Sequence, residues 1–133
     1  MNQIITSLLN LLPAAFSGGI ASSLLTQYIA SVREKRHQKA KFLGFLAEWR
    51  FEMDKFYPRD TIIYGIYNSK ATVLIGLAED IKRFVRKRKH SMFANLISKT
   101  SRFTYDEIEK GKQAGQKAFL EAIDALFAFA NNL

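Results

Sequence analysis

The sequence predicts an all-α protein in which an N-terminal single-pass transmembrane helix is followed by a small antiparallel helical bundle. Residues Met1 to Val32 contain no Asp, Glu, Lys, Arg or His, and a dense basic segment begins at Arg33. After the start of this basic segment, hydrophobic residues recur at helical spacing in several segments separated by Pro, Gly or capping residues. We therefore expect an N-terminal membrane region, residues 1–32, and a helical domain, residues 33–133.

The predicted membrane span follows Pro13, which is tolerated at the first helical position because its missing N–H has no partner there. Residues 14–32 then form a helix of about 20 residues, roughly 30 Å long, which matches the hydrocarbon core of a bilayer. Several Ser, Thr and Gln residues make this helix only weakly apolar. Burial of the helix in a soluble assembly is therefore the competing interpretation.

Small residues in the span repeat at intervals of four, a spacing that lets two helices approach closely in lipid. The predicted packing residues are Ala14, Ala15, Gly18, Gly19, Ser22 and Ser23. We expect self-association through them, with a monomeric anchor as the alternative. Residues 2–12 are amphipathic and suit a short interfacial helix, or else the first part of one long helix kinked at Pro13.

The distribution of charge predicts the orientation. All 20 basic and 12 acidic residues follow Val32, so the net charge of +8 belongs to residues 33–133. Because Lys and Arg close to a span remain cytoplasmic, the N-terminus should face outward and the helical domain should lie at the inner (cytoplasmic) membrane. The first charge follows the apolar segment, which argues against a cleaved secretory signal. The chain has no Cys, which excludes disulfides and thiolate metal sites.

The first helix of the domain should run from Arg33 to Tyr57, continuous with the span and ended by Pro58. Its apolar face comprises Phe42, Phe45, Leu46, Trp49, Met53 and Phe56. The second should run from about Thr61 to Lys89. Its stripe comprises Ile63, Ile66, Tyr67, Val73, Leu74, Leu77, Ile81, Phe84 and Val85. We expect Gly65 and Gly76 on this helix to permit close packing against aromatic side chains.

A third helix is predicted over Ser91 to Ser101, with Phe93, Leu96 and Ile97 on one side. The residues from Thr104 to Glu107 have the spacing of a capping box. The helix that follows should be interrupted between Gly111 and Gly115. From Gln116 the apolar pattern resumes, with Phe119, Leu120, Ile123, Leu126, Phe127 and Ala130.

Two basic clusters should meet at the membrane if the second helix runs antiparallel to the first. The residues predicted to contact anionic lipid are Arg33, Lys35, Arg36, Lys39, Lys41, Lys82, Arg83, Arg86, Lys87, Arg88 and Lys89. The anionic inner leaflet attracts such residues by about 1 kcal/mol each. A solvated helix end whose cations favour the negative helix C-terminus is the alternative. Nucleic acid is a less favoured partner, because the run lacks a recognisable binding motif.

No catalytic, cofactor or metal constellation is evident. His37 and His90 lie within basic runs, and no spacing of His, Asp and Glu suggests a metal site. The segment from Gly111 to Lys117 lacks the GxxxxGK[ST] pattern of a phosphate loop.

We therefore expect a non-enzymatic single-pass membrane protein whose helical domain binds a protein partner or forms a homo-oligomer. Two alternatives remain: a toxin- or holin-like pore-forming effector, and a membrane-tethered nucleic-acid-binding protein.

Overall fold

A computed structural model describes residues 19–57, 63–110 and 112–133, and these residues form helices and short connections without a strand. The elements are α2 (Gly19–Phe56), α3 (Ile63–Lys82), η1 (Lys87–Lys89), α4 (His90–Ser101), η2 (Asp106–Lys110) and α5 (Lys112–Asn131). The all-α prediction is confirmed. Contacts divide the chain into two units, Met1–His37 and Gln38–Leu133.

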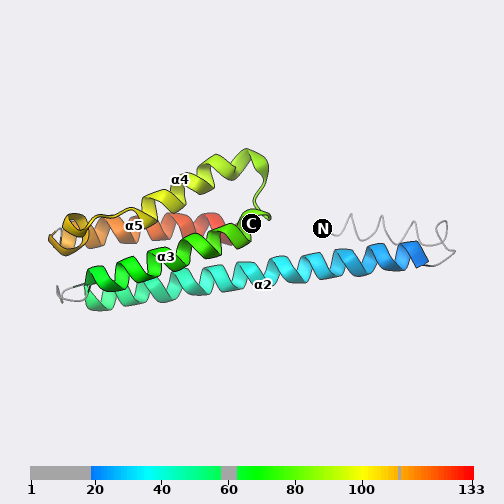
Figure 1. Cartoon of the computed structure of the whole chain (residues 1–133), viewed down its shortest axis with the longest axis horizontal. Helices are drawn as coiled ribbons and strands as arrows, with labels where there is room; N and C mark the ends of the chain where they lie inside the picture. Colours follow the sequence, from blue (N-terminus) through cyan, green and yellow to red (C-terminus); the bar gives the residue numbers. More distant parts are fainter. Residues whose placement is uncertain (1–18, 58–62, 111) are drawn as a thin grey trace. The chain divides into compact units, whose positions relative to one another are not determined.

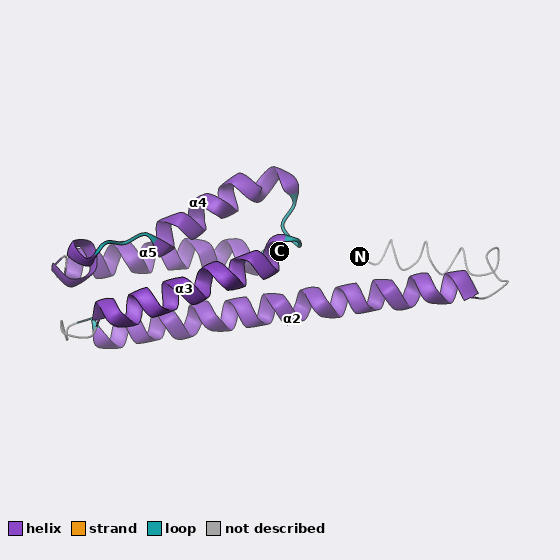
Figure 2. Ribbon diagram, in the orientation of Figure 1, coloured by secondary structure: helices purple, strands orange, loops and turns teal. Residues whose placement is uncertain are grey.

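The second unit is an antiparallel helical bundle, as the apolar stripes predict. It contains the part of α2 that follows His37 together with α3, α4 and α5. Each of these helices runs opposite to the one before it in the chain (Figures 1 and 2). The predicted continuity of the first helix across residue 33 is also confirmed, since α2 is unbroken from Gly19 to Phe56.

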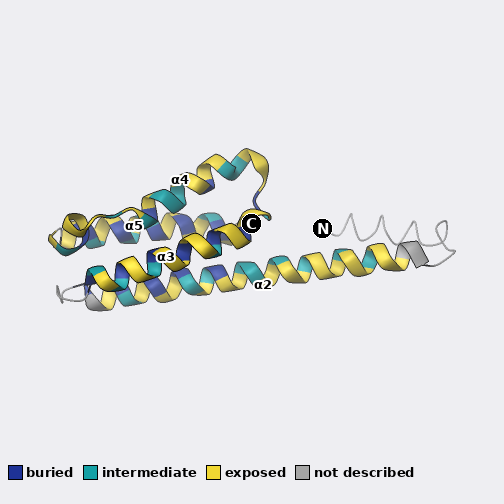
Figure 3. Ribbon diagram, viewed as in Figure 1, coloured by how far each residue is buried: buried dark blue, intermediate teal, exposed yellow. Residues whose placement is uncertain are grey.

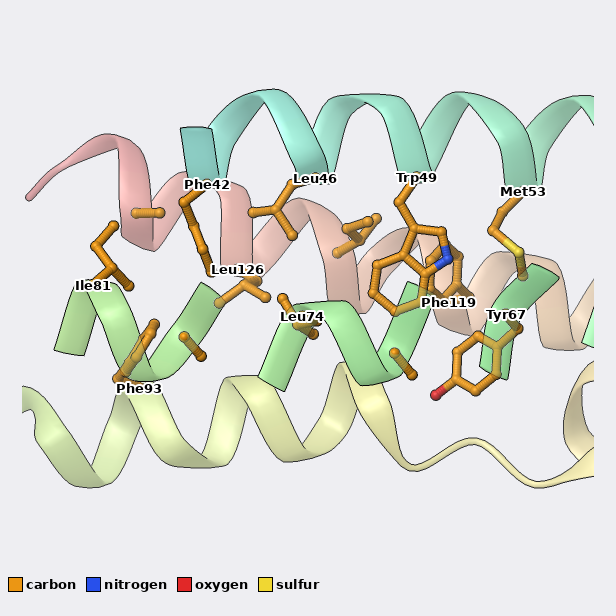
Figure 4. Close-up of a cluster of buried hydrophobic side chains, with 14 of the residues drawn as sticks. Phe42, Leu46, Trp49, Met53, Tyr67, Leu74, Ile81, Phe93, Phe119 and Leu126 are labelled. Carbon is orange, nitrogen blue, oxygen red and sulfur yellow. The ribbon is translucent and has the colours of Figure 1, made fainter. Parts of the chain in front are cut away.

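The core of the bundle is formed by one face of each helix (Figure 4). Trp49 lies at its centre, with its ring 5.6 Å from that of Tyr67 on α3 and 4.9 Å from that of Phe119 on α5. Phe42 contacts α4 through Phe93, at a ring distance of 6.2 Å. The buried hydrophobic residues are Phe42, Leu46, Trp49, Met53, Tyr57, Ile63, Tyr67, Ala71, Leu74, Ala78, Ile81, Val85, Phe93, Ile108, Phe119, Ile123, Leu126 and Ala130. All of them belong to the second unit.

Two residues of the predicted stripes lie on the surface instead. Val73 is 47% exposed and Phe127 is 36% exposed (Figure 3 shows the alternation of burial along the helices). Each is next in sequence to a fully buried leucine, Leu74 or Leu126. Successive side chains on a helix point about 100° apart. When the leucine faces the core, the adjacent Val73 or Phe127 therefore points toward solvent.

Gly65 and Gly76 do not permit the close packing expected of them. Added Cβ atoms at either position would meet no atom within 4 Å. Both residues lie on the exposed face of α3.

The hydroxyl of Tyr67 on α3 forms hydrogen bonds with backbone groups at the C-terminal end of α4. Tyr67 Oη donates to the carbonyl of Thr100 (2.8 Å) and accepts from the N–H of Phe103 (2.9 Å). The last carbonyls of a helix and the N–H groups that follow it lack helical partners. The Tyr67 side chain therefore provides a hydrogen-bond partner for one such carbonyl, that of Thr100, and for one such N–H, that of Phe103.

The segment between α4 and α5 contains half of the predicted capping box. The N–H of Glu107 donates to Thr104 Oγ1 (3.3 Å), and the single π-helical turn η2 follows. Glu109, which is not part of the predicted box, accepts from the N–H of Tyr64 (3.1 Å) in the first turn of α3. The predicted break between Gly111 and Gly115 is absent from the described residues, because α5 is continuous from Lys112 through Gly115, and Gly111 itself lies outside the described residues.

Gly115 lies inside α5 at a point of close approach. A Cβ atom there would overlap the carbonyl of Glu107 and the hydroxyl of Tyr57. The buried Tyr57 hydroxyl has no hydrogen-bond partner among the described residues. Burial, and secondarily the charge of Glu109, raise the pKa of Tyr57 to about 12.

Candidate functional site

The densest group of cations forms the connection between α3 and α4, rather than a helix end. α3 ends at Lys82, seven residues before the predicted Lys89. The backbone then forms tight turns, with N–H groups of Phe84, Val85 and Lys89 donating to carbonyls three residues earlier. We call residues 82–89 the basic connection; its cations are Lys82, Arg83, Arg86, Lys87, Arg88 and Lys89.

Apolar side chains attach the basic connection to the core. Val85 is buried and Phe84 is half-buried. His90, the first residue of α4, lies with Nε2 2.7 Å from the carbonyl oxygen of Val85. Because a carbonyl only accepts, this nitrogen carries the proton and donates. These contacts leave the cations outside: only Lys89 is half-buried, and the others are exposed.

The basic connection lies at the same end of the bundle as Lys39 and Lys41, as predicted. Phe42, one turn further along α2, lies beside Ile81 and Phe93 in Figure 4. Lys39 Nζ donates to the backbone oxygen of Leu133 (3.2 Å). Arg33, Lys35 and Arg36 lie on α2 in the first unit, and Lys35 is the half-buried one of these.

Most cations of the basic connection have no acidic partner. In the described chain, Lys82, Arg86, Lys87, Arg88 and Lys89 form no ion pair. Arg83 lies 4.6 Å from the centre of the Phe84 ring. The ion pairs of the bundle lie elsewhere: Arg50–Asp124, Lys70 with Glu48 and Glu52, and Lys110–Asp106. The basic end therefore carries concentrated positive charge that is available to an anionic partner.

An exposed apolar side chain accompanies these cations. Met92, in the first turn of α4, is 57% exposed. Because Met is flexible and polarisable, an exposed Met that follows the cations in sequence can add apolar contact to a charged binding surface. The sequence analysis missed Met92, although its place directly after the basic run could have indicated it.

The predicted membrane-packing residues lie in the first unit. Ala14, Ala15 and Gly18 are outside the described residues. Gly19, Ser22 and Ser23 begin α2, and both serines are exposed. Leu24 and Ile29 are 50% and 42% exposed. Among the residues that the structure describes, no helix combines the length and apolarity needed to cross a bilayer.

A second exposed apolar surface lies between α2 and α5. Phe51 is 65% exposed, and Phe127 lies across a shallow groove of about 300 Å³ from it. The ion pair between Arg50 and Asp124, 2.7 Å long, lies in the same groove. Sequence analysis placed Phe127 in the core and therefore missed this surface.

The described residues contain no group of three His, Cys, Asp or Glu side chains close enough to hold a metal ion. His37 is exposed, and Nε2 of His90 is hydrogen-bonded to the carbonyl of Val85.

Comparisons with protein-family models, with curated proteins and with solved structures give no match to this chain.

Proposed function

We propose that this protein is a non-enzymatic membrane-surface module whose bundle binds anionic lipid through the basic connection. The observation that carries the proposal is the group of exposed cations that form no ion pair within the described residues, on a connection whose Val85 is buried in the core and that is followed in sequence by the exposed Met92.

The charge and the apolar side chain act together. Each Lys or Arg near an anionic leaflet contributes about 1 kcal/mol of attraction, which decreases with added salt. Met92 supplies apolar area that enters the interface once the charges have brought the surface close. Lys39 and Lys41 at the same end add to the attraction.

We also propose that residues 14–32 anchor the chain in the inner membrane as a single span, with the N-terminus outside. Support comes from the absence of charge up to Val32 and from the exposure of Leu24 and Ile29, which are not buried in a globule. Extraction of membranes with carbonate tests it: an anchored chain stays with the lipid, whereas release into the supernatant would leave only surface binding.

Partner binding or self-assembly at the membrane is proposed for the surface between α2 and α5. Its support is the unusual exposure of Phe51 beside Phe127.

The lipid proposal is tested with residues 38–133, which retain every buried hydrophobic residue of the described core. We expect this bundle to float with phosphatidylglycerol vesicles and not with phosphatidylcholine vesicles. Replacing Arg86, Lys87 and Arg88 by Gln should weaken binding up to about 100-fold at low salt, from about 1 kcal/mol for each cation.

A matched control removes three other cations, Lys99, Lys110 and Lys117, which are exposed and lie outside the basic connection. It lowers the net charge equally and should reduce binding much less. Equal losses in the two variants would show that net charge alone attracts the bundle, and would reject a specific basic surface. Binding of short DNA or RNA in preference to vesicles would favour the nucleic-acid alternative.

A further inference from the structure

A groove between α3 and α4 opens beside the basic connection. Its volume is about 260 Å³. Its apolar lining includes Ile75, Ala78, Phe93, Ala94 and Ile97. Ile75 is 52% exposed there, although it is a large aliphatic residue. We call this cavity the α3–α4 groove.

The polar residues of the groove are arranged along its length. Lys82 and His90 lie at the end next to the basic connection, and Arg102 lies beyond the opposite end of α4. Lys82 and Arg102 form no ion pair in the described chain. Glu79, one turn before Lys82, is the carboxylate of the lining. The lining therefore has an excess of positive charge above an apolar floor.

We infer that the α3–α4 groove accepts one acyl chain of an anionic phospholipid, whose phosphate lies at Lys82. This inference rests on the proposed function, because the basic connection must first bring the groove to the membrane. Lys82 attracts the phosphate as a point charge. His90 lines this end of the groove, and its Nε2 donates to the carbonyl of Val85.

The size and direction of the groove agree with this occupant. Pockets that enclose a whole drug-sized molecule measure roughly 300–1,000 Å³, so this smaller, open groove would cover part of one acyl chain and leave the rest in the bilayer. The chain would enter at the membrane-facing end and extend along Ile75, Phe93 and Ile97. Arg102 can line the far end with its aliphatic stem while its guanidinium stays in water.

The groove between α4 and α5 provides a contrast within the same bundle. It has about 370 Å³ and an apolar lining that includes Leu96, Phe103 and Ala118. Its charged residues are Lys99 and Glu121, which cancel. It lacks the excess of cations, so it should not select an anionic lipid.

The experiment uses the full chain in phosphatidylcholine vesicles that contain phosphatidylglycerol, with a photoactivatable acyl chain on one of the two lipids. Cross-linked residues are mapped by mass spectrometry. We expect the phosphatidylglycerol probe to label residues 75–98, with the basic connection at 82–89 left out of the comparison, about fivefold more than the phosphatidylcholine probe, the factor for one cation near a phosphate. Equal labelling by the two probes would overturn the inference.

Ser98→Trp fills the groove from its rim, because Ser98 is only half-buried. It should abolish most labelling of residues 75–98 without reducing vesicle flotation. Ala94→Phe repeats the test at an exposed lining residue in case the first variant does not fold. Ala118→Trp, which fills the α4–α5 groove, is the control and should leave labelling unchanged. Persistent labelling in the folded groove-filling variants would contradict the inference.

Charge variants test the position of the phosphate. Lys82→Gln should lower labelling by the phosphatidylglycerol probe about fivefold, and Glu79→Gln should raise it about twofold by removing a nearby like charge. Flotation separates the two proposals. If residues 38–133 float with phosphatidylglycerol vesicles while the groove of the full chain is not labelled, the proposed function stands and this inference is lost, whereas both are lost if residues 38–133 do not float.

Discussion

At the scale of single residues, two tyrosine hydroxyls in the core have opposite surroundings. The hydroxyl of Tyr67 donates to Thr100 and accepts from Phe103, whereas that of Tyr57 is buried without a partner among the described residues. A buried polar group stabilises the fold only when it is hydrogen-bonded. The two side chains should therefore respond differently to loss of the hydroxyl.

Tyr67→Phe should lower the free energy of unfolding by about 1–3 kcal/mol, because it leaves buried backbone groups of Thr100 and Phe103 unpaired. Tyr57→Phe should be neutral or stabilising, since it removes only an unpaired group. Urea titrations followed by far-ultraviolet circular dichroism measure both, with the exposed Tyr105→Phe as the control. A larger loss in Tyr57→Phe than in Tyr67→Phe would refute this assignment.

The same tyrosines predict loss of stability in alkali. Burial raises the pKa of Tyr57 to about 12 and also raises the pKa of Tyr67. Above pH of about 10 the unfolded chain releases these protons while the folded chain keeps them, so the unfolded state binds fewer protons. This contribution is fully present below pH 10 and is lost as pH rises toward 12. Either Phe variant should flatten the decline measured between pH 9 and 11.5, and an unchanged slope would disprove the account.

At the scale of the helices, the glycines within helices differ in how closely other atoms pack against them. Gly115 on α5 lies against Tyr57, the residue after α2, and against Glu107 of η2. Gly76 on α3 has open space above it. Glycine inside a helix costs up to about 1 kcal/mol relative to Ala. The close contact explains why Gly115 must be glycine, whereas the structure gives no such reason for Gly76.

Gly115→Ala should destabilise the bundle by more than about 1 kcal/mol, because its Cβ overlaps a backbone carbonyl that cannot move aside easily. Gly76→Ala should stabilise it by up to about 1 kcal/mol. Thermal unfolding of the pair provides a direct comparison. The prediction fails if both substitutions shift the midpoint in the same direction.

At the scale of the whole molecule, the described core belongs to one unit of the chain. The buried hydrophobic residues run from Phe42 to Ala130, and all lie within Gln38–Leu133. The described part of the first unit, residues 19–37, contributes none of those buried residues. The bundle therefore contains the apolar burial that stabilises it.

Removal of residues 1–37 should change the free energy of unfolding by less than about 0.5 kcal/mol, the usual range for changes outside a core. Chemical unfolding of the full chain and of residues 38–133 measures the difference. A molten or unfolded fragment would mean that the first unit stabilises the bundle.

Much of the bundle could be predicted because helical periodicity is a local property. The spacing of Phe42, Leu46, Trp49 and Met53 already defines the face of α2 that is buried. Ile108 could not be assigned to the core in this way, since it lies in a single π-helical turn without a periodic pattern.

The candidate site was predictable in composition and only partly in shape. The basic run is evident in the sequence, and the antiparallel order of the helices places it at the end of the bundle where Phe42 lies near Ile81, directly after Lys41. The end of α3 at Lys82 was not evident, because Arg83 to Lys89 carry no proline or glycine that would stop a helix.

The sequence by itself determined the helical class, the order of the elements, most of the buried faces and the concentration of cations near residue 86. These follow from backbone propensity and from the period of apolar residues, which act within one or two turns of helix. Only the tertiary structure decided that Phe127 is exposed, that Gly115 is a point of contact and that a groove opens between α3 and α4. Each depends on which helix faces which, and residues distant in sequence set that geometry by packing.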